Sequence, residues 1–246
     1  MIGSRGEGQG SQTSQTSQTH KLSNLSNLSN PLLLPSIALL GATGLVGRQC
    51  LELLADDRAF ERIVVVARRR FGEATAPRVE GHLIDFDQLE AHADIFAVDQ
   101  VICALGTTIR TAGSKEKFRA VDYDIPITAA RMALRKGARH FLLVSSLGAD
   151  ARSRFFYLRV KGELEDALRT LGFRSLTIVR PSVLIGDRGE RRFGEEIAKR
   201  FGSLMPGRWK PVQARAVAHA LVHSAKEDVP GMHVLESDAI APFARG

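Results

Sequence analysis

Cysteine is scarce in this sequence, which contains only Cys50 and Cys103 among its 246 residues. The two lie far apart, and each sits in an apolar run, where a cysteine behaves as a small hydrophobic side chain. A disulfide framework is therefore not expected, and this usage is typical of a reducing compartment. The sequence thus predicts a cytoplasmic protein.

Long hydrophobic runs are also missing. No apolar stretch approaches the roughly 20 residues that a membrane helix requires, and the early run at residues 32–34 is short and bounded by prolines. The first residues lack a basic region followed by an apolar stretch, which a secretion signal would need. We expect neither a membrane segment nor a signal peptide.

Motifs that read nucleic acids are absent as well, including zinc-finger spacing and an RNP-type aromatic motif. The formal net charge is +7, but the basic residues are scattered over most of the predicted helices, with acidic residues among them. We interpret the excess as solvated faces together with a phosphate-binding pocket, and we expect no nucleic-acid partner. His219 and His223 share a predicted helix face, but no cysteine or carboxylate nearby completes a metal site.

The first 35 residues differ in kind from the rest. Residues 11–30 repeat the triplets Ser-Gln-Thr and Leu-Ser-Asn, and such a tract has too few bulky apolar side chains to offset the entropy of ordering. We predict a disordered low-complexity tail over residues 1–35, with a partner-binding tail as the alternative. A single NAD(P)-binding domain is expected over residues 36–246.

Beyond the tail, short apolar runs alternate with helical patterns. Strands that alternate with helices predict βαβ units, which build a parallel sheet with helices on both faces. We therefore expect an α/β fold, a Rossmann-type doubly wound sheet, with a small C-terminal substrate-side extension over residues 181–230. Pro126 is expected to kink or restart the helix predicted over residues 115–136. The predicted strands cover residues 36–40, 63–67, 82–84, 100–105, 140–145, 175–180 and 232–236.

A glycine-rich loop of the form G-x-x-G-x-x-G joins the first strand to the first helix at residues 41–47. Gly41 permits a tight turn, Gly44 lets the backbone approach a pyrophosphate, and Gly47 allows the helix to pack closely on the strand. The helix N-terminus then offers free N–H groups and the positive end of its dipole to phosphates. The strand before the loop and the helix after it predict a dinucleotide site. This site also includes Thr43, Leu45, Val46 and Arg48.

The tip of the second strand distinguishes NAD from NADP. An acidic residue there would bond the ribose hydroxyls of NAD, but this chain has Arg68 and Arg69. Guanidinium groups favour a 2′-phosphate, and Arg48 is a further candidate for the same phosphate. Asp85 and Phe86 follow the third strand, where a carboxylate can accept from the adenine amino group. We predict NADP(H) as the cofactor.

Two further segments are assigned to the same cofactor. Small residues at the end of the fourth strand let the backbone pass close to the adenosine ribose. A turn after the sixth strand, at Arg180 and Pro181, is expected to close over the nicotinamide. Residues 186–211, which hold several arginines, are expected to form the substrate-side loop. The residues assigned to the end of the fourth strand are Ala104, Leu105, Gly106 and Thr107.

Ser146 ends the fifth strand, and Tyr157 and Lys161 follow on a predicted helix. Residues four apart lie on one helical face, so the ammonium can stabilise a phenolate and hold the nicotinamide ribose. The tyrosine can then exchange a proton with a substrate oxygen, while the Ser146 hydroxyl polarises the substrate carbonyl. We predict these three as the catalytic residues, with Tyr157 and Lys161 also touching the cofactor.

Longer motifs surround these residues. They are Leu105-Gly106-Thr107-Thr108 after the fourth strand, Ser145-Ser146-Leu147-Gly148-Ala149-Asp150 after the fifth, and Tyr157-Leu158-Arg159-Val160-Lys161-Gly162-Glu163 on the helix. With the glycine loop, they resemble the atypical short-chain dehydrogenase/reductases, in particular the Tat-interacting oxidoreductase-like proteins and their bacterial NAD(P)-binding relatives. The resemblance implies a Rossmann fold, NADPH binding and a serine–tyrosine–lysine oxidoreductase site, but no particular substrate.

Three functions are compatible with these residues. We favour an NADPH-dependent oxidoreductase that transfers a hydride to or from a small carbonyl or alcohol, with Tyr157 as the acid and base. A non-catalytic NADPH-binding regulatory protein is the alternative, because Ser146 and Tyr157 lie closer in sequence than in most active short-chain dehydrogenases. A nucleotide-sugar epimerase or dehydratase ranks third, since only 65 of the 246 residues follow Pro181. We expect a small-molecule substrate and a monomer or homodimer.

Overall fold

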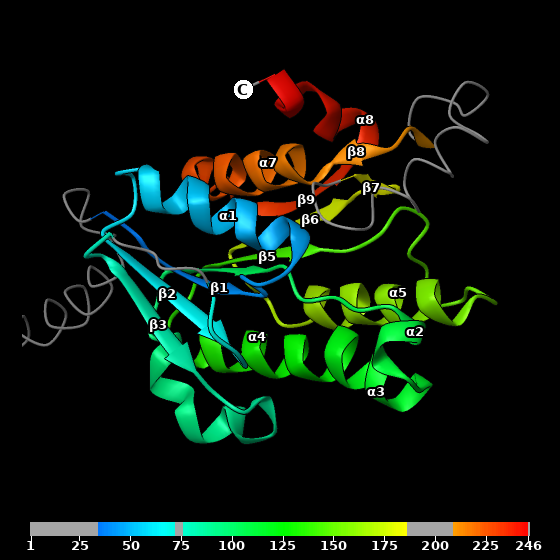
Figure 1. Ribbon diagram of the computed structural model, residues 1–246, viewed down its shortest axis with the longest axis horizontal. Helices are drawn as coiled ribbons and strands as arrows, with labels where there is room; N and C mark the ends of the chain where they lie inside the picture. Colours follow the sequence, from blue (N-terminus) through cyan, green and yellow to red (C-terminus); the bar gives the residue numbers. More distant parts are fainter. Residues whose placement is uncertain (1–33, 72–75, 186–208, 246) are drawn as a thin grey trace, which may run out of the picture. The chain divides into compact units, whose positions relative to one another are not determined.

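The computed structural model describes residues 34–71, 76–185 and 209–245 of the chain. The predicted tail, up to residue 33, and most of the predicted substrate-side loop, residues 186–208, lie outside this part. Within Leu34–Gly246, the described strands form a seven-stranded sheet in the order β3-β2-β1-β4-β5-β6-β9. All neighbouring strands are parallel, and helices cover both faces (Figure 1). The predicted α/β Rossmann-type fold is confirmed.

The central strands are buried along their whole length, because helices cover both sides of them. The strand order reverses at β1, and sheets of this kind bind ligands beyond the carboxyl ends of the strands at such a point. A separate short ladder pairs β7 with β8. The strands are β1 (Ser36–Leu40), β2 (Arg62–Ala67), β3 (Val79–Leu83), β4 (Gln100–Cys103), β5 (His140–Val144), β6 (Ser175–Arg180), β7 (Leu184–Ile185), β8 (Val212–Gln213) and β9 (Gly231–Glu236).

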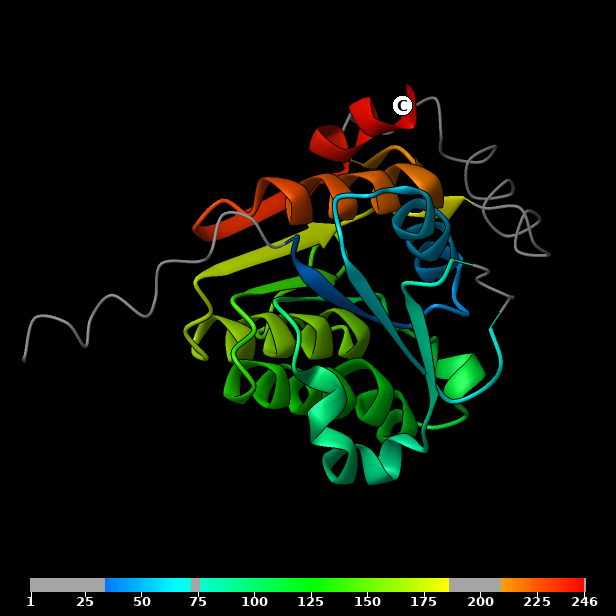
Figure 2. The ribbon, with the colours of Figure 1, turned by 90° about the vertical axis from the view of Figure 1, so that its left-hand side faces the viewer.

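Helices α1 (Leu45–Asp56) and α7 (Ala214–Glu227) cover one face of the sheet, while α4 (Ile125–Arg135) and α5 (Phe156–Arg169) cover the other (Figures 1 and 2). Each face has its own apolar cluster. Alternate residues of β1 belong to alternate clusters, as the two-residue period of a strand requires. In the part of the chain that the structure describes, no helix is long and apolar enough to span a membrane.

Pro126 interrupts the helix predicted over residues 115–136. A π-helical turn, η2 (Ala120–Asp124), separates α3 (Lys115–Arg119) from α4. Proline has no N–H to donate to the carbonyl four residues earlier, which belongs to Asp122, and the wider π turn accommodates this loss. The turn carries Asp122 into the interior, where its exposed fraction is 0%.

Element boundaries near the site differ from the sequence prediction, most clearly in the third and fourth strands. The third strand was expected at residues 82–84, but β3 begins at Val79, which pairs with Ile63 of β2. Polar and small residues at its centre, including Glu80, hide this strand from a hydrophobic pattern. The fourth strand ends at Cys103, so the residues that follow it belong to a loop.

Short elements complete the fold. A 3-10 segment, η1 (Phe86–Phe96), follows β3, and it includes Gln88 and His92 with non-helical backbone angles. The sequence analysis did not predict this segment, although Phe86, Leu89 and Phe96 recur at helical spacing and are buried. The remaining elements are α2 (Ile109–Ala112), α8 (Ser237–Ile240) and η4 (Ala241–Arg245).

Both cysteines are free and buried. Burial is the main reason that the pKa of the Cys103 thiol rises to about 11. The thiol is therefore protonated at neutral pH, and it packs among apolar side chains beneath the sheet.

Candidate cofactor and catalytic site

The glycine loop forms a cradle between β1 and α1, made by Gly41, Gly44 and Gly47. Gly41 adopts φ +89°, and its carbonyl accepts a hydrogen bond of 2.8 Å from the Gly44 N–H. Gly44 is the N-cap of α1, and no side chain caps this helix end. The first N–H groups of α1 therefore face outward without a side-chain acceptor, as an anion site requires.

Each glycine of the cradle has its own steric reason. A Cβ on Gly41 would lie 2.5 Å from the Ala104 carbonyl oxygen, and one on Gly47 would lie 2.0 Å from the Gly41 carbonyl oxygen. Backbone atoms therefore leave no room for a side chain at Gly41 or Gly47. A Cβ on Gly44 would meet only the Gly41 oxygen at 3.2 Å and the Ala104 oxygen at 3.9 Å, so it would otherwise fill the space in front of the helix end. The cradle fits a dinucleotide diphosphate.

The tip of β2 carries Arg68 and Arg69, and both are exposed. The Arg68 guanidinium lies 5.6 Å from the centroid of the Phe86 ring. Among the described residues, neither arginine has a carboxylate partner. Because β2 lies beside β1 in the sheet, these two positive charges stand next to the glycine cradle.

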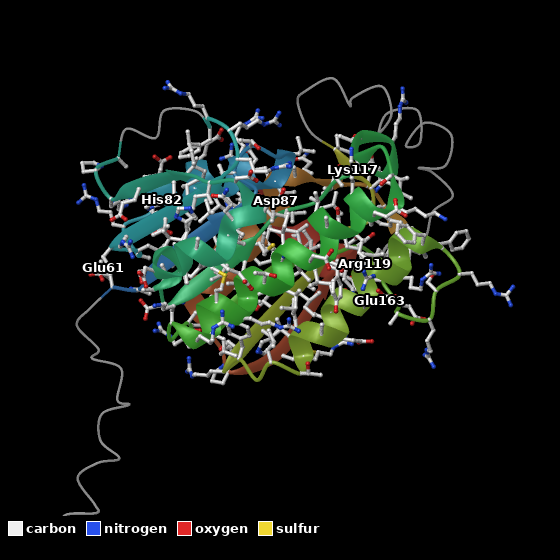
Figure 3. The ribbon with its side chains drawn as sticks, turned by 90° about the horizontal axis from the view of Figure 1, so that it is seen from below. Glu61, His82, Asp87, Lys117, Arg119 and Glu163 are labelled. Atoms are coloured by element: carbon white, nitrogen blue, oxygen red, sulfur yellow. The ribbon has the colours of Figure 1, made fainter. Side chains whose placement is uncertain are left out.

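The residues after β3 are divided between solvent and core. Asp85 is exposed, and its side chain accepts a hydrogen bond of 3.2 Å from the Asp87 N–H, which caps η1. Figure 3 shows Asp87 on this segment. Phe86 is 8% exposed and packs in the core below the sheet. Its ring therefore supports Arg68, and its assignment to the cofactor site remains a prediction.

The loop after β4 runs against the cradle. Ala104, just beyond β4, is still bonded to β1, since its N–H donates to the Leu40 carbonyl over 2.9 Å, and its own carbonyl faces Gly41. Further on, the Thr107 N–H donates to Asp122 Oδ2 over 2.9 Å. Gly106 is exposed between these anchors. The loop is thus held at both ends, beside the position where the sequence places the adenosine ribose.

Helix α5 carries the predicted tyrosine and lysine. Tyr157 is half-buried, and its ring centroid lies 5.6 Å from that of Phe118 on α3. Lys161 is 3% exposed, and its Nζ lies 2.8 Å from Asp122 Oδ1. Burial alone would lower the pKa of Lys161, but the charge and hydrogen bond of Asp122, together with the nearby Tyr157, outweigh it, and the pKa lies above its ordinary value. Burial raises the pKa of Asp122, an effect that the ammonium opposes.

Asp122 is the site residue that the sequence prediction missed. A signal was present, because Asp122 follows Phe118 by four residues and precedes Pro126 by four, and both neighbours are buried. Residues at this spacing share a helical face. A carboxylate on an apolar helix face could therefore have been identified as a buried charge, although the sequence does not reveal that Lys161 is its partner.

A second ion pair fixes α3 against α5. Arg119 of α3 and Glu163 of α5 point toward each other (Figure 3). The Arg119 guanidinium also lies 4.2 Å from the centroid of the Tyr123 ring. The turn that holds Asp122 is thus bracketed by contacts that keep it against the helix of Tyr157 and Lys161.

Ser146 lies on a loop that packs tightly on α5. A Cβ on Gly162 of α5 would lie 2.2 Å from the Ala151 nitrogen of this loop, so only glycine permits the contact. Ser146 is half-buried, and among the described residues its hydroxyl donates a hydrogen bond only to the Leu147 carbonyl, over a long 3.4 Å. This hydroxyl retains its capacity to donate to a substrate. The structure brings the loop of Ser146 and the helix of Tyr157 and Lys161 together.

The turn after β6 lies beside buried carboxylates, and its assignment to the cofactor site stays a prediction. The Arg180 guanidinium binds Glu165, which is 0% exposed, and lies 3.6 Å from Glu236. Glu165 and Glu236 therefore pair with the Arg180 guanidinium, the group that the sequence analysis assigned to the cofactor site. Pro181 accepts a hydrogen bond of 2.9 Å from the Leu147 N–H, so the turn supports the loop of Ser146. No cluster of potential metal ligands occurs in the described ranges.

The fold and the glycine cradle define a Rossmann protein with a site for a nicotinamide dinucleotide. The chain belongs to the NAD(P)H-binding family, whose model matches residues 41–228, and the resemblance to atypical short-chain dehydrogenase/reductases is confirmed. Protein HTATIP2 of Rattus norvegicus is 36% identical over 212 residues, covering 83% of this chain and 87% of that protein. Protein FMP52 of Lodderomyces elongisporus is 35% identical over 212 residues, covering 80% and 89%.

Solved structures share the fold at low sequence identity. UDP-glucose 4-epimerase of Thermotoga maritima, solved with UDP-glucose, has a TM-score of 0.62 at 15% identity and covers 85% of this chain and 80% of its own. MoeE5, solved with UDP-glucose and NAD, has a TM-score of 0.64 at 14% identity, with coverages of 86% and 81%. These similarities confirm the Rossmann-type fold of the chain.

The predicted cytoplasmic location is corrected by the relatives. The FMP52 proteins of Lodderomyces elongisporus, Candida albicans and Emericella nidulans are all named as mitochondrial. The small number of cysteines and the lack of long apolar runs are properties of the folded domain. A domain located in mitochondria can have the same composition. Composition therefore could not distinguish the two compartments.

Proposed function

We propose that this protein is an NADPH-dependent oxidoreductase that interconverts a small carbonyl compound and its alcohol. The observation that supports it most is the buried ammonium of Lys161 beside the cofactor loop. A Cβ added at Gly106 would lie 3.8 Å from Lys161 Nζ. A lysine that is buried here cannot serve as a solvent-exposed charge. It also lies one helical turn from Tyr157.

Each side chain has a defined task in this proposal. The bound dinucleotide supplies the hydride for reduction or accepts it in the reverse direction. The Tyr157 hydroxyl donates a proton to the carbonyl oxygen of the substrate, and the Lys161 charge favours the phenolate that remains. Ser146 donates a hydrogen bond to the same oxygen and polarises the carbonyl. The cradle of Gly41, Gly44 and Gly47 holds the diphosphate.

Tyr157→Phe is expected to abolish turnover while the protein still binds NADPH. The variant keeps the ring that packs on Phe118 but loses the proton donor, so kcat should fall about 100-fold or more. The measurement is the loss of NADPH absorbance with a panel of aldehydes and ketones, together with a fluorescence titration of NADPH binding. Tyr123→Phe, at the chain's other tyrosine, is the matched control and should change neither value.

Two outcomes would count against the enzyme. Equal turnover by wild type and Tyr157→Phe would remove the tyrosine from the mechanism. Wild type that binds NADPH but reduces no member of the panel would favour the alternative, a regulatory protein that responds to NADPH without catalysis.

The preference for NADPH is proposed on the exposed arginines at the tip of β2. Replacing Arg68 and Arg69 together by alanine should weaken NADPH binding at least about 10-fold, because charge-assisted contacts to a 2′-phosphate are lost. NADH affinity should change less than about twofold, since that nucleotide lacks the phosphate. Fluorescence titration with both nucleotides measures the ratio. Replacing the exposed Arg131 and Arg135 of α4 together by alanine controls for net charge, and equal losses for NADPH and NADH would refute the assignment.

A further inference from the structure

Phe155 exposes an aromatic ring that does not contribute to the packing of the fold. It is the N-cap residue of α5, and its exposed fraction is 74%. The next residue, Phe156, is half-buried, because its ring lies 5.7 Å from that of Phe118 on α3. Keeping a phenylalanine ring in water forgoes the free energy that its burial would provide. The Phe155 ring is therefore free to be buried against a partner.

A second apolar side chain is exposed at the same end of the molecule. Ile109 of α2 is 39% exposed, and α2 and α3 lie beside the beginning of α5 (Figure 1). Lys115 of α3 connects these elements, since its Nζ lies 5.4 Å from the centroid of the Phe156 ring. Two segments that are distant in the sequence thus form one surface, which we call the basic face (residues 109–117 and 150–159).

Cationic side chains surround the apolar ones on the basic face. Six cations stand there against two carboxylates, and Arg152, whose side chain is 93% exposed, has Asp150 only at 3.7 Å. Such an excess of exposed positive charge attracts an anionic partner. The cations are Arg110, Lys115, Lys117, Arg152, Arg154 and Arg159, and the carboxylates are Glu116 and Asp150.

The shape of the basic face favours a lipid bilayer over a protein as that partner. The Phe155 ring and the Arg152 side chain both protrude into solvent. A protein partner would need a pocket that fits the ring, whereas a bilayer accepts a protruding aromatic ring at the level of its headgroups. Lysine and arginine side chains around the ring can then contact the phosphates of anionic lipids.

We propose that the basic face docks on an anionic lipid bilayer, with the Phe155 ring inserted among the headgroups. A surface contact of this kind requires no membrane-spanning segment. Because Tyr157 follows Phe155 by two residues, docking holds the candidate site close to the lipid, where apolar carbonyl compounds accumulate. The contact itself needs neither nucleotide nor turnover, so it is independent of the proposed reaction.

Co-sedimentation of the full chain with lipid vesicles is the primary test. Vesicles of phosphatidylcholine with about one third phosphatidylglycerol should bind the protein at least about 10-fold more tightly than phosphatidylcholine alone, and salt should weaken this binding. Phe155→Ser should weaken it about 10-fold, because the inserted ring is lost, and should leave the melting temperature unchanged. Val229→Ser, at a side chain 48% exposed beside Asp228, is the matched control and should bind as wild type does.

Charge reversal tests whether the basic face itself makes the contact. Arg152→Glu combined with Arg154→Glu should weaken binding to the anionic vesicles at least about 10-fold. Arg131→Glu combined with Arg135→Glu, at exposed positions of α4, changes the net charge equally and should have a much smaller effect. Equal losses in the two double variants would mean adsorption by net charge alone, and the proposal would be wrong.

Fluorescence reports whether residue 155 enters the bilayer. In Phe155→Trp, the emission that remains after subtraction of the wild-type signal from Trp209 should shift to shorter wavelength when anionic vesicles are added. An unshifted emission from vesicle-bound protein would overturn insertion of the ring. Poly-glutamate in solution serves as the competing probe: if it binds as tightly as the vesicles and depends equally on Phe155, the partner is an acidic protein segment and not a bilayer.

Discussion

Replacing Gly47 by alanine should destabilise the protein by about 3 kcal/mol or more, since overpacking against fixed backbone is costly. The added methyl group would lie 2.0 Å from the Gly41 carbonyl oxygen and 2.6 Å from its carbonyl carbon. Neither atom can rotate away as a side chain would, so α1 must move off the loop. Thermal unfolding without nucleotide should show the loss directly.

Gly44→Ala provides the contrast on the same loop. Its methyl group would be 3.2 Å from the Gly41 oxygen and would otherwise face open space, so the free energy of unfolding should change by less than about 1 kcal/mol. NADPH affinity should nevertheless fall more than about 10-fold, because the methyl group fills the place of the diphosphate. The two variants thus separate the packing role of one glycine from the binding role of the other.

Gly172→Ala is the control for backbone strain. Gly172 has φ +79° but nothing within 4 Å of its added Cβ, so only the left-handed conformation is penalised, by about 1 kcal/mol. Its NADPH affinity should equal that of wild type. A Gly47→Ala protein as stable as Gly172→Ala, or a Gly44→Ala protein with unchanged affinity, would contradict the cradle.

The second large effect is expected at Asp228, at the end of the sheet opposite the site. Asp228 caps the C-terminal end of α7 with φ 44°, and its carboxylate is contacted by three cationic or polar groups. Arg139 Nε lies at 2.7 Å, Arg174 Nη1 at 3.1 Å and the buried His140 Nδ1 at 3.1 Å. Burial alone would raise the pKa of Asp228, but the His140 ring and the Arg139 guanidinium lower it to about 2.

Asp228→Asn should lower the free energy of unfolding by about 2 kcal/mol at neutral pH, as the depressed pKa implies. Because the folded-state pKa lies below the unfolded value of 3.8, the stabilisation is complete above that pH. It is lost as the pH falls through about 2. Asparagine tolerates the left-handed backbone, so the variant removes charge without adding strain. Urea unfolding at neutral and at acid pH measures the difference.

Asp94→Asn is the matched control for Asp228→Asn. Asp94 pairs with Lys136 at 2.6 Å, but its side chain is 95% exposed, so no measurable change is expected. The difference in the free energy of unfolding between wild type and Asp228→Asn should become smaller as the pH is lowered. If this difference in the free energy of unfolding is the same over the whole pH range, the carboxylate charge is not its cause.

Much of the fold and the cofactor site could be predicted from the amino-acid sequence. The run of apolar strands and the spacing of Gly41, Gly44 and Gly47 depend on local geometry, which neighbouring residues determine. The same holds for Tyr157 and Lys161, since a helix places residues four apart on one face whatever surrounds it. Arg68 and Arg69 were identified because the end of a strand next to the loop is a position that sequence order reveals.

Only the tertiary structure determined which charged side chains form ion pairs with one another. Lys161 is 39 residues from Asp122, and Arg180 is 15 from Glu165, so no local pattern pairs them. The pairing follows from the order in which strands and helices pack, which brings α5 against the π-helical turn and the end of β6. Burial then sets the strength of each interaction. The sequence alone therefore predicted a nucleotide cradle and a tyrosine–lysine helix, whereas packing determined that Asp122 contacts the lysine and that Arg180 binds Glu165.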